Sequence, residues 1–279
     1  TSVTVAADNA HYSSDDGVLL NKAKDSLILY PISRQGAYAI PGTVASIKDS
    51  AFAFRAGLTS VTIPGSVSSI GGSAFSCCTS LTSVTIENGA KSIGSWAFSV
   101  CTKLTSVAIP GSVASIGEYA FAYCPRLTSV TIGNGVELID YKAFFGCAGL
   151  TSLTIPGSVA SIGENAFFRC ARLTSVTIEH GVELIADDAF FGCVGLTSLT
   201  IPSTVASIGE GAFAHCNYLK SVTVLNPVPP YIGYGAFDPL RTCLYVPANS
   251  INAYRAAEGW RGFECVKPLA AAPSGVSGE

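Results

Sequence analysis

The sequence has little charge and no methionine. Lysine, arginine, aspartate and glutamate make up 13% of its 279 residues, and the formal net charge is −3, whereas a typical soluble domain has about 25% charged residues. A chain without a strongly basic surface is not expected to bind nucleic acid. No apolar run approaches the ~18 residues of a membrane span, and no basic-then-apolar segment opens the chain. We therefore expect neither a membrane span nor a signal peptide in this sequence.

The sequence also lacks the motifs of catalysis and metal binding. Its three histidines, His11, His180 and His215, are scattered, and none has a nucleophile or carboxylate at a motif spacing. We find no glycine-rich phosphate loop, nucleophile elbow or zinc signature, and the aspartates near the N-terminus do not follow the calcium-loop pattern. These absences predict a protein that is not an enzyme, with no catalytic residues, no cofactor and no metal site.

What the sequence does contain is a repeat of 23 residues. The motif Leu-Thr-Ser-Val-Thr-Ile recurs eight times without insertion, and the same step is kept by a phenylalanine, an isoleucine and, from the second unit, a cysteine. Units this short cannot bury their own apolar faces, so they must stack. A second period of 46 residues alternates Pro-Gly/Ser turns with Asn/His-Gly turns. The repeated leucines are Leu58, Leu81, Leu104, Leu127, Leu150, Leu173, Leu196 and Leu219, and the cysteines are Cys78, Cys101, Cys124, Cys147, Cys170, Cys193 and Cys216.

These periods predict an α/β repeat solenoid, a right-handed leucine-rich repeat with 23-residue coils and a parallel concave sheet. Val61 and Ile63 follow the period of two of a strand, so they point inward together. The segment Ala-Phe-x-x-Cys has the spacing of a short helical or 3-10 turn on the convex side. Stacked coils then place like residues on like, in ladders.

Both ends depart from the repeat, as the caps of a solenoid do. We expect an N-terminal partial repeat and hairpin insertion over 1–34, in which residues 1–5 match the strand motif and the hairpin turns between Asn21 and Asp25. The repeat array follows over 35–237 and a C-terminal cap over 238–266, with strands at 243–247 and 263–266 and a short helix over 250–259. Residues 267–279 have the composition of a tail or linker.

The repeat and both ends resemble the BspA-type bacterial leucine-rich repeat family. The motif that carries the resemblance is Leu-x-x-Val-x-Ile-Pro-x-x-Val-x-x-Ile-Gly-x-x-Ala-Phe-x-x-Cys over residues 35–237, together with the end segments Asp-Gly-Val-Leu and Leu-Tyr-Val-Pro. The resemblance implies a cell-surface or secreted protein, often an adhesin, frequently from gut or oral Bacteroidetes. It implies no catalytic residues and does not name a partner, because such repeats serve many functions.

The outward strand positions form a face of hydroxyl side chains. Of its 24 positions, 22 are Ser or Thr. One interpretation is that threonine merely suits an exposed strand; the other is an array that hydrogen-bonds a glycan or an extended peptide, or, as a further alternative, ice. The face lacks the Trp, Tyr and Arg of compact hot spots. Its candidate binding residues are Thr59, Thr62, Thr82, Thr85, Thr105, Thr128, Thr131, Thr151, Thr154, Thr174 and Thr177.

Two further groups of residues have alternative interpretations. The seven cysteines that recur every 23 residues are expected to be buried free thiols. Cys243 and Cys265 do not belong to that series; they lie on two expected strands of the C-terminal cap and are a candidate disulfide. Phe145, Phe168 and Phe191 each follow the repeated phenylalanine in successive units. They pack sideways against neighbouring coils, or they form a convex apolar patch for a partner or a dimer.

The sequence therefore favours a recognition or adhesion module that binds a host extracellular protein or glycan through an extended surface, at the cell surface or after secretion. The alternative is a structural spacer that displays other domains and has no ligand. We expect a monomer. The two functions differ in one respect: a binding module should carry a patch of non-repeating residues, and here these lie in the ends. They are Tyr12, Tyr30, Arg34, Tyr38, Tyr231, Tyr234, Arg241, Tyr245 and Trp260.

Overall fold

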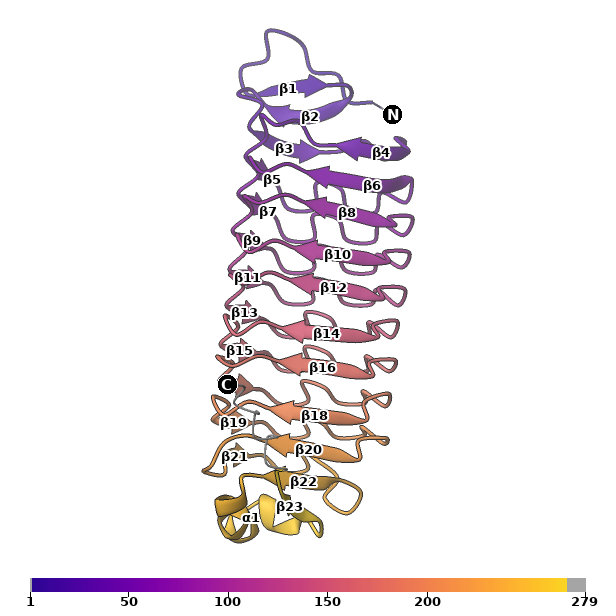
Figure 1. Ribbon diagram of the computed structural model, residues 1–279. Coiled ribbons are helices and arrows are strands. Elements are labelled where there is room, and N and C mark those ends of the chain that lie inside the picture. The colour runs from indigo at the N-terminus through magenta and orange to yellow at the C-terminus, as the bar shows by residue number, and fades with distance from the viewer. Residues whose placement is uncertain (1, 270–279) are drawn as a thin grey trace, which may run out of the picture.

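The computed structural model describes residues 2–269 and consists of a tall stack of coils (Figure 1). The predicted fold class is confirmed: each 23-residue step forms one coil, and equivalent strands of successive coils pair in parallel. Each coil contributes one long strand to one side of the stack. These strands are β6 (Leu58–Ile63), β8 (Ser83–Ile86), β10 (Ser106–Ile109), β12 (Ser129–Ile132), β14 (Ser152–Ile155), β16 (Ser175–Ile178), β18 (Ser198–Ile201) and β20 (Ser221–Val224).

Each coil also has a second strand of only two residues. These short strands continue the N-terminal hairpin into a 12-stranded sheet. They were not predicted as strands from the sequence. The reason for the omission is that two residues are too few to show a periodicity. They are β5 (Ser46–Ile47), β7 (Ser69–Ile70), β9 (Ser92–Ile93), β11 (Ser115–Ile116), β13 (Leu138–Ile139), β15 (Ser161–Ile162), β17 (Leu184–Ile185), β19 (Ser207–Ile208) and β21 (Tyr231–Ile232).

The third side of each coil consists of consecutive turns in place of the expected helical or 3-10 turn. Successive backbone amides alternate between an acceptor in their own coil and an acceptor in the next coil. Ala74 N–H donates to Gly71 O of the same coil at 3.3 Å, whereas Phe75 N–H donates to Ala97 O of the next coil at 2.7 Å. Ser73 and Cys77 have positive φ of 54° and 59°, which a helix does not allow. We call the set of bonds between these turns the turn ladder. It fixes the coil spacing on the side that has no strand.

The core contains a column of stacked phenylalanine rings. The rings of Phe75 and Phe98 stack with centroids 5.0 Å apart and planes 1° from parallel, and similar stacking continues through every coil to Phe213. Tyr30 extends the column at one end and Phe237 at the other. Because each stacked pair adds about 0.5–1.5 kcal/mol to the burial of its area, the column holds the coils together along their whole length.

The 46-residue period links coils in pairs through their turns. The carboxylate of Glu87 accepts the Gly65 N–H of the preceding Pro-Gly turn at 2.9 Å, and Glu179 does the same for Gly157 at 3.1 Å. Turns of the two kinds therefore bond to each other in these two pairs of coils, whereas in the pair between them Gly133 stands in place of the glutamate.

The long-strand sheet is interrupted twice, between β12 and β14 and between β16 and β18. Each break precedes a strand in which leucine, Leu153 or Leu199, replaces the inward valine of the other long strands. Both leucine strands pair in register with the strands that follow them, Leu153 opposite Val176 and Leu199 opposite Val222, so each break lies only on the N-terminal side of its leucine.

The two caps differ in part from the sequence expectations. Residues 2–5 form no strand, and Thr1 lies outside the described residues. The predicted hairpin is present as β2 (Val18–Asn21) and β3 (Ser26–Leu29), and β1 (Tyr12–Asp15) adds a second antiparallel pair before β4 (Gly36–Ala39). The C-terminal cap contains β22 (Cys243–Val246), η1 (Ala248–Ser250), α1 (Ile251–Ala256), η2 (Trp260–Gly262) and β23 (Val266–Pro268).

The end of the chain departs from expectation in two details. The last strand begins at Val266, because residues 263–265 complete the turn after η2, and it includes Lys267 and Pro268 of the expected tail. The strand is extended because Leu269 N–H also bonds to Val246 O at 2.8 Å. The remainder of the expected tail, residues 270–279, lies outside the described residues.

Candidate binding surfaces

The threonines of the long-strand face fall into two rows with different roles. In the first row, which we call the strand-entry row, every hydroxyl except that of Thr59 bonds to a carbonyl of the preceding coil. Thr82 Oγ1 donates to Thr59 O of the preceding coil at 2.9 Å, and the bond recurs in the next four coils over 3.1–3.4 Å. Its members are Thr59, Thr82, Thr105, Thr128, Thr151 and Thr174. Apart from that of Thr59, these hydroxyl protons are therefore already used to link coils.

In the second row, the mid-strand row, the hydroxyls have no partner among residues 2–269. Its members lie one residue after the buried valine or leucine, so their side chains point away from the core. They are Thr62, Thr85, Thr131, Thr154 and Thr177, and Ala108 interrupts the row. Parallel strands lie about 4.8 Å apart, so this row presents free hydroxyls at a regular spacing along the stack.

A shallow hollow of about 370 Å³ lies in this face where the sheet is broken between β12 and β14. Its lining includes Thr131, Thr154 and Thr177 of the mid-strand row, together with neighbouring serines. The break thus brings three of the predicted residues around one depression.

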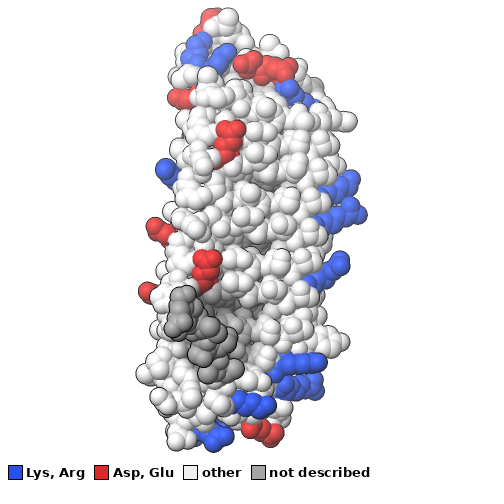
Figure 2. Space-filling view, in the orientation of Figure 1, with Lys and Arg blue, Asp and Glu red and all other residues white. Residues whose placement is uncertain are grey.

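Figure 2 shows that charged side chains are sparse over the middle of this side of the molecule, and that lysine and arginine gather along one edge. Lys103, Arg126 and Arg172 are each exposed and lie one residue before a buried leucine.

The second group of predicted residues, Phe145, Phe168 and Phe191, forms a ladder outside the core. Ring centroids are 4.9 Å and 4.8 Å apart and the planes nearly parallel. Tyr123 packs against one end and His215 against the other. All three phenylalanines are half-buried, so the structure brings them together as neighbours of one another.

The repeated cysteines form a buried rung of free thiols. Each thiol donates to the carbonyl of a phenylalanine in the preceding coil, as Cys78 Sγ does to Phe52 O at 3.0 Å. Burial raises the pKa of Cys78 and Cys124 to about 12. Cys243 and Cys265 are brought together in a disulfide between β22 and the turn before β23.

The non-repeating residues of the N-terminal end are held by contacts with one another. The Arg34 guanidinium lies over the rings of Tyr30 and Tyr38 and forms an ion pair with Asp16 at 2.5 Å. Burial raises the pKa of Tyr38 to about 12. This end is therefore closed by its own side chains.

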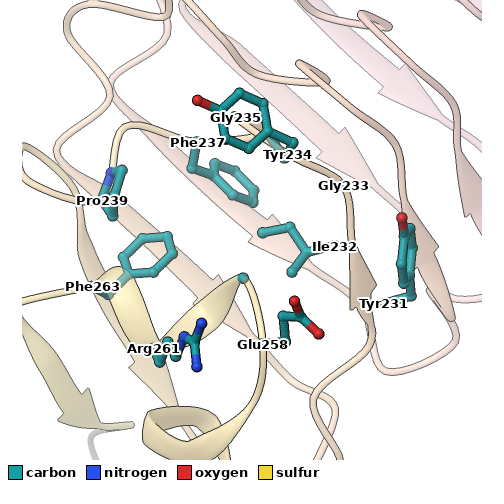
Figure 3. A pocket seen from close by; sticks show the side chains of 12 residues that line it. Tyr231, Ile232, Gly233, Tyr234, Gly235, Phe237, Pro239, Glu258, Arg261 and Phe263 are labelled. Atoms are coloured by element: carbon teal, nitrogen blue, oxygen red, sulfur yellow. The ribbon is translucent and has the colours of Figure 1, made fainter.

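The C-terminal end has a cavity of about 750 Å³ between the last coil and the cap. Tyr231 and Tyr234 at its mouth are 69% and 88% exposed, although Trp260 of the same non-repeating group is fully buried. Figure 3 shows the tyrosines on the coil side and Glu258 and Arg261 on the cap side. Glu258 and Arg261 were not predicted from the sequence, because residues of a cap follow no repeat and carry no motif.

Among residues 2–269, no group of three His, Cys, Asp or Glu side chains is placed to hold a metal ion. In the same part of the chain, helices are too short or too polar to span a bilayer.

Comparisons with known proteins agree with this architecture. A family model described as BspA type leucine rich repeat region, in six copies, matches residues 35–151 and 138–246. No curated protein matches the chain.

Solved structures with similar folds include two leucine-rich repeat proteins. A leucine-rich repeat protein from Eubacterium ventriosum is 26% identical, with a TM-score of 0.53; the match covers 60% of this chain and 52% of that protein. A leucine rich repeat protein from T. pallidum is also 26% identical, with a TM-score of 0.53, over 78% of this chain and 91% of that one. This chain thus spans about half the length of the Eubacterium protein and nearly all of the T. pallidum protein.

Proposed function

The chain belongs to the BspA-type leucine-rich repeat family, and on this premise we propose that it is a non-catalytic recognition module that binds a host protein or glycan at the cell surface or after secretion. The observation that carries the proposal is the mid-strand row. Polar side chains that stabilise a solenoid form hydrogen bonds within it, as the strand-entry hydroxyls do with carbonyls of the preceding coil. The mid-strand hydroxyls have no such partner among residues 2–269 and remain available to a ligand.

A long, regular row suits a repetitive ligand. Each hydroxyl can donate and accept one hydrogen bond, and a neutral bond contributes only about 0.5–1.5 kcal/mol. Binding must therefore engage several coils at once. A glycan chain or an extended polypeptide offers polar groups at a regular spacing, whereas a compact protein hot spot would require Trp, Tyr or Arg, which the mid-strand row lacks.

The cap disulfide supports a location outside the cytosol. Structural disulfides form and persist in oxidising compartments, and the bond between Cys243 and Cys265 joins two segments of the cap. Together with the low charge of the hydroxyl face, this favours an exported surface protein, in the role of adhesion or recognition.

The test is a binding screen of the full chain against glycan arrays and immobilised extracellular-matrix proteins. We expect saturable binding to a glycan or matrix protein. A screen with no binding in either class would contradict the proposal and favour a spacer that displays other domains.

A further inference from the structure

The turn ladder ends without a partner at the C-terminal end of the stack. In the earlier coils, three amides of the turn donate to carbonyls of the following coil. The last such step has two of these bonds, from Gly211 N–H to Tyr234 O at 3.0 Å and from Phe213 N–H to Ala236 O at 2.8 Å. The equivalent amides of the final coil belong to Gly235 and Phe237. Within residues 2–269, neither has an acceptor.

These two amides keep the geometry of bonded ones. Gly235 has φ of 65°, close to the 61° of Gly211, so the backbone conformation of the ladder continues into the last coil. The Phe237 ring also continues the core column, 4.9 Å from Phe213. The donors therefore point toward the place where another coil would lie.

The cap covers that place only in part. Trp260 Nε1 donates to Pro230 O at 2.8 Å and so completes the short-strand side. Above the Phe237 ring, Trp260 and Phe263 lie 6.1 Å away and tilted, and do not reach the spacing of the column. What remains is the cavity of about 750 Å³, lined by Gly235 and Phe237 among others (Figure 3).

We propose that this cavity binds a peptide segment of a partner protein, which takes the turn conformation of a coil and adds part of one more coil to the turn ladder. The acceptors that every coil offers are backbone carbonyls two residues apart, such as those of Tyr234 and Ala236. In the stack, the residue between two such carbonyls has a positive φ, as Asn165 does at 56°. The bound segment therefore repeats the turn conformation of a coil, and its backbone supplies the acceptors, as the backbone of an added strand does at an open sheet edge.

The ladder also specifies the size of one residue of the segment. The carbonyl that meets the phenylalanine amide belongs to a fully buried alanine in each coil, for example Ala166, Ala189 and Ala212. The segment should therefore carry alanine or glycine at that position, because a larger side chain would have to displace the core.

The charges at the cavity favour a peptide over an acidic sugar. Glu258 and Arg261 both line it, and neither forms an ion pair among residues 2–269. One charge of each sign gives the mouth no net attraction for an anion. The exposed rings of Tyr231 and Tyr234 offer apolar contact area beside the donors.

The test uses the full chain and a blocked synthetic peptide, Ile-Gly-Glu-Asn-Ala, which is the sequence of residues 162–166. In the stack, the last and third residues of this segment supply carbonyls to Phe144 and Lys142. Amide hydrogen exchange is followed by NMR. At a peptide concentration about 100-fold above its Kd, exchange at Gly235 and Phe237 should slow by about 100-fold, whereas Gly211 and Phe213, bonded already, should not change.

Matched variants separate this site from other surfaces. Alanine at both Tyr231 and Tyr234 should weaken peptide binding by about tenfold. Tyr218→Ala, which removes a tyrosine of similar exposure elsewhere (63%), should not. A peptide with valine in place of its alanine should bind poorly.

Three outcomes would overturn the proposal: no protection of Gly235 and Phe237, equal binding of the valine peptide, or protection by glucuronate and not by the peptide. The mid-strand row is not part of this cavity. These outcomes therefore do not bear on the recognition proposed for the long-strand face, which the binding screen tests separately.

Discussion

The indole Nε1 of Trp260 donates a hydrogen bond of 2.8 Å to the carbonyl oxygen of Pro230. In the preceding coil, the equivalent carbonyl, that of Ala206, accepts the Tyr231 N–H of the next coil at 3.0 Å. A side chain of the cap thus takes the place of a missing backbone. It closes the short-strand column and leaves the turn ladder open.

Trp260→Phe should destabilise the protein, because it leaves the buried Pro230 carbonyl without a donor. The expected loss is about 1–3 kcal/mol in the free energy of unfolding, measured by urea denaturation. Trp96→Phe is the control, since Trp96 is partly exposed at 39% and stacks on Tyr119. Equal stability of the Trp260→Phe variant and the wild type would show that the bond does not hold the cap.

The disulfide between Cys243 and Cys265 predicts the number of thiols. Ten cysteines with two of them bonded leave eight free thiols, which should react in the denatured, unreduced protein. Ten reactive thiols would contradict the pairing. Replacing both cysteines by serine should lower the unfolding free energy by about 3 kcal/mol, because the bond closes a loop with a sequence separation of 22.

The cysteine rung predicts a loss of stability at alkaline pH. Burial raises the pKa of Cys124 from 9.0 to about 12. Below pH 9 the thiol is neutral in both folded and unfolded chains, and its contribution is fully present. Above pH 9 the unfolded chain releases the proton and the folded chain retains it, so stability falls until about pH 12. Each thiol contributes a slope of about 1.4 kcal/mol per pH unit.

This slope can be isolated by comparing the wild type with Cys124→Ala. Unfolding free energies at pH values from 8 to 11 should fall more steeply in the wild type, by the contribution of one thiol. Parallel curves for the two proteins would contradict the raised pKa. Ionisation of tyrosines contributes to both proteins alike and cancels in the difference.

The outer phenylalanine ladder predicts a structural role for Phe168, which lies between Phe145 and Phe191. Phe168→Ala should cost about 1–3 kcal/mol, less than a fully buried phenylalanine, because the ring is half-buried. Sedimentation should give a monomer for both wild type and variant. A wild-type dimer that the variant dissociates would instead identify this ladder as an interface.

How far the fold follows from the sequence depends on how many residues carry each signal. The leucine, isoleucine, phenylalanine and cysteine columns were predictable because each keeps one step throughout. The turn ladder was not, since its positive-φ positions hold Trp96, Tyr119 and Tyr123, bulky residues that local preference places elsewhere. Bonds between coils override that preference.

The same contrast applies to the candidate sites. The hydroxyl face was predictable from the alternation of inward and outward residues, but its division into a bonded and a free row was not, because it depends on which carbonyl of the neighbouring coil each hydroxyl reaches. The C-terminal cavity lies between the last coil and a cap that follows no repeat. Of its lining residues, only the tyrosines were recognised in the sequence, as residues that depart from the repeat.

The central claim, that the mid-strand hydroxyls recognise a ligand, is tested most directly by the affinity of one triple variant. Valine at Thr131, Thr154 and Thr177 keeps the shape and strand preference of the face and removes three hydroxyls. Alanine at Ser115, Ser161 and Ser207, on the short strands, is the control. For the glycan or matrix protein found in the screen, Kd should rise by at least about tenfold in the valine variant and stay unchanged in the control. An unchanged Kd in the valine variant would contradict the claim.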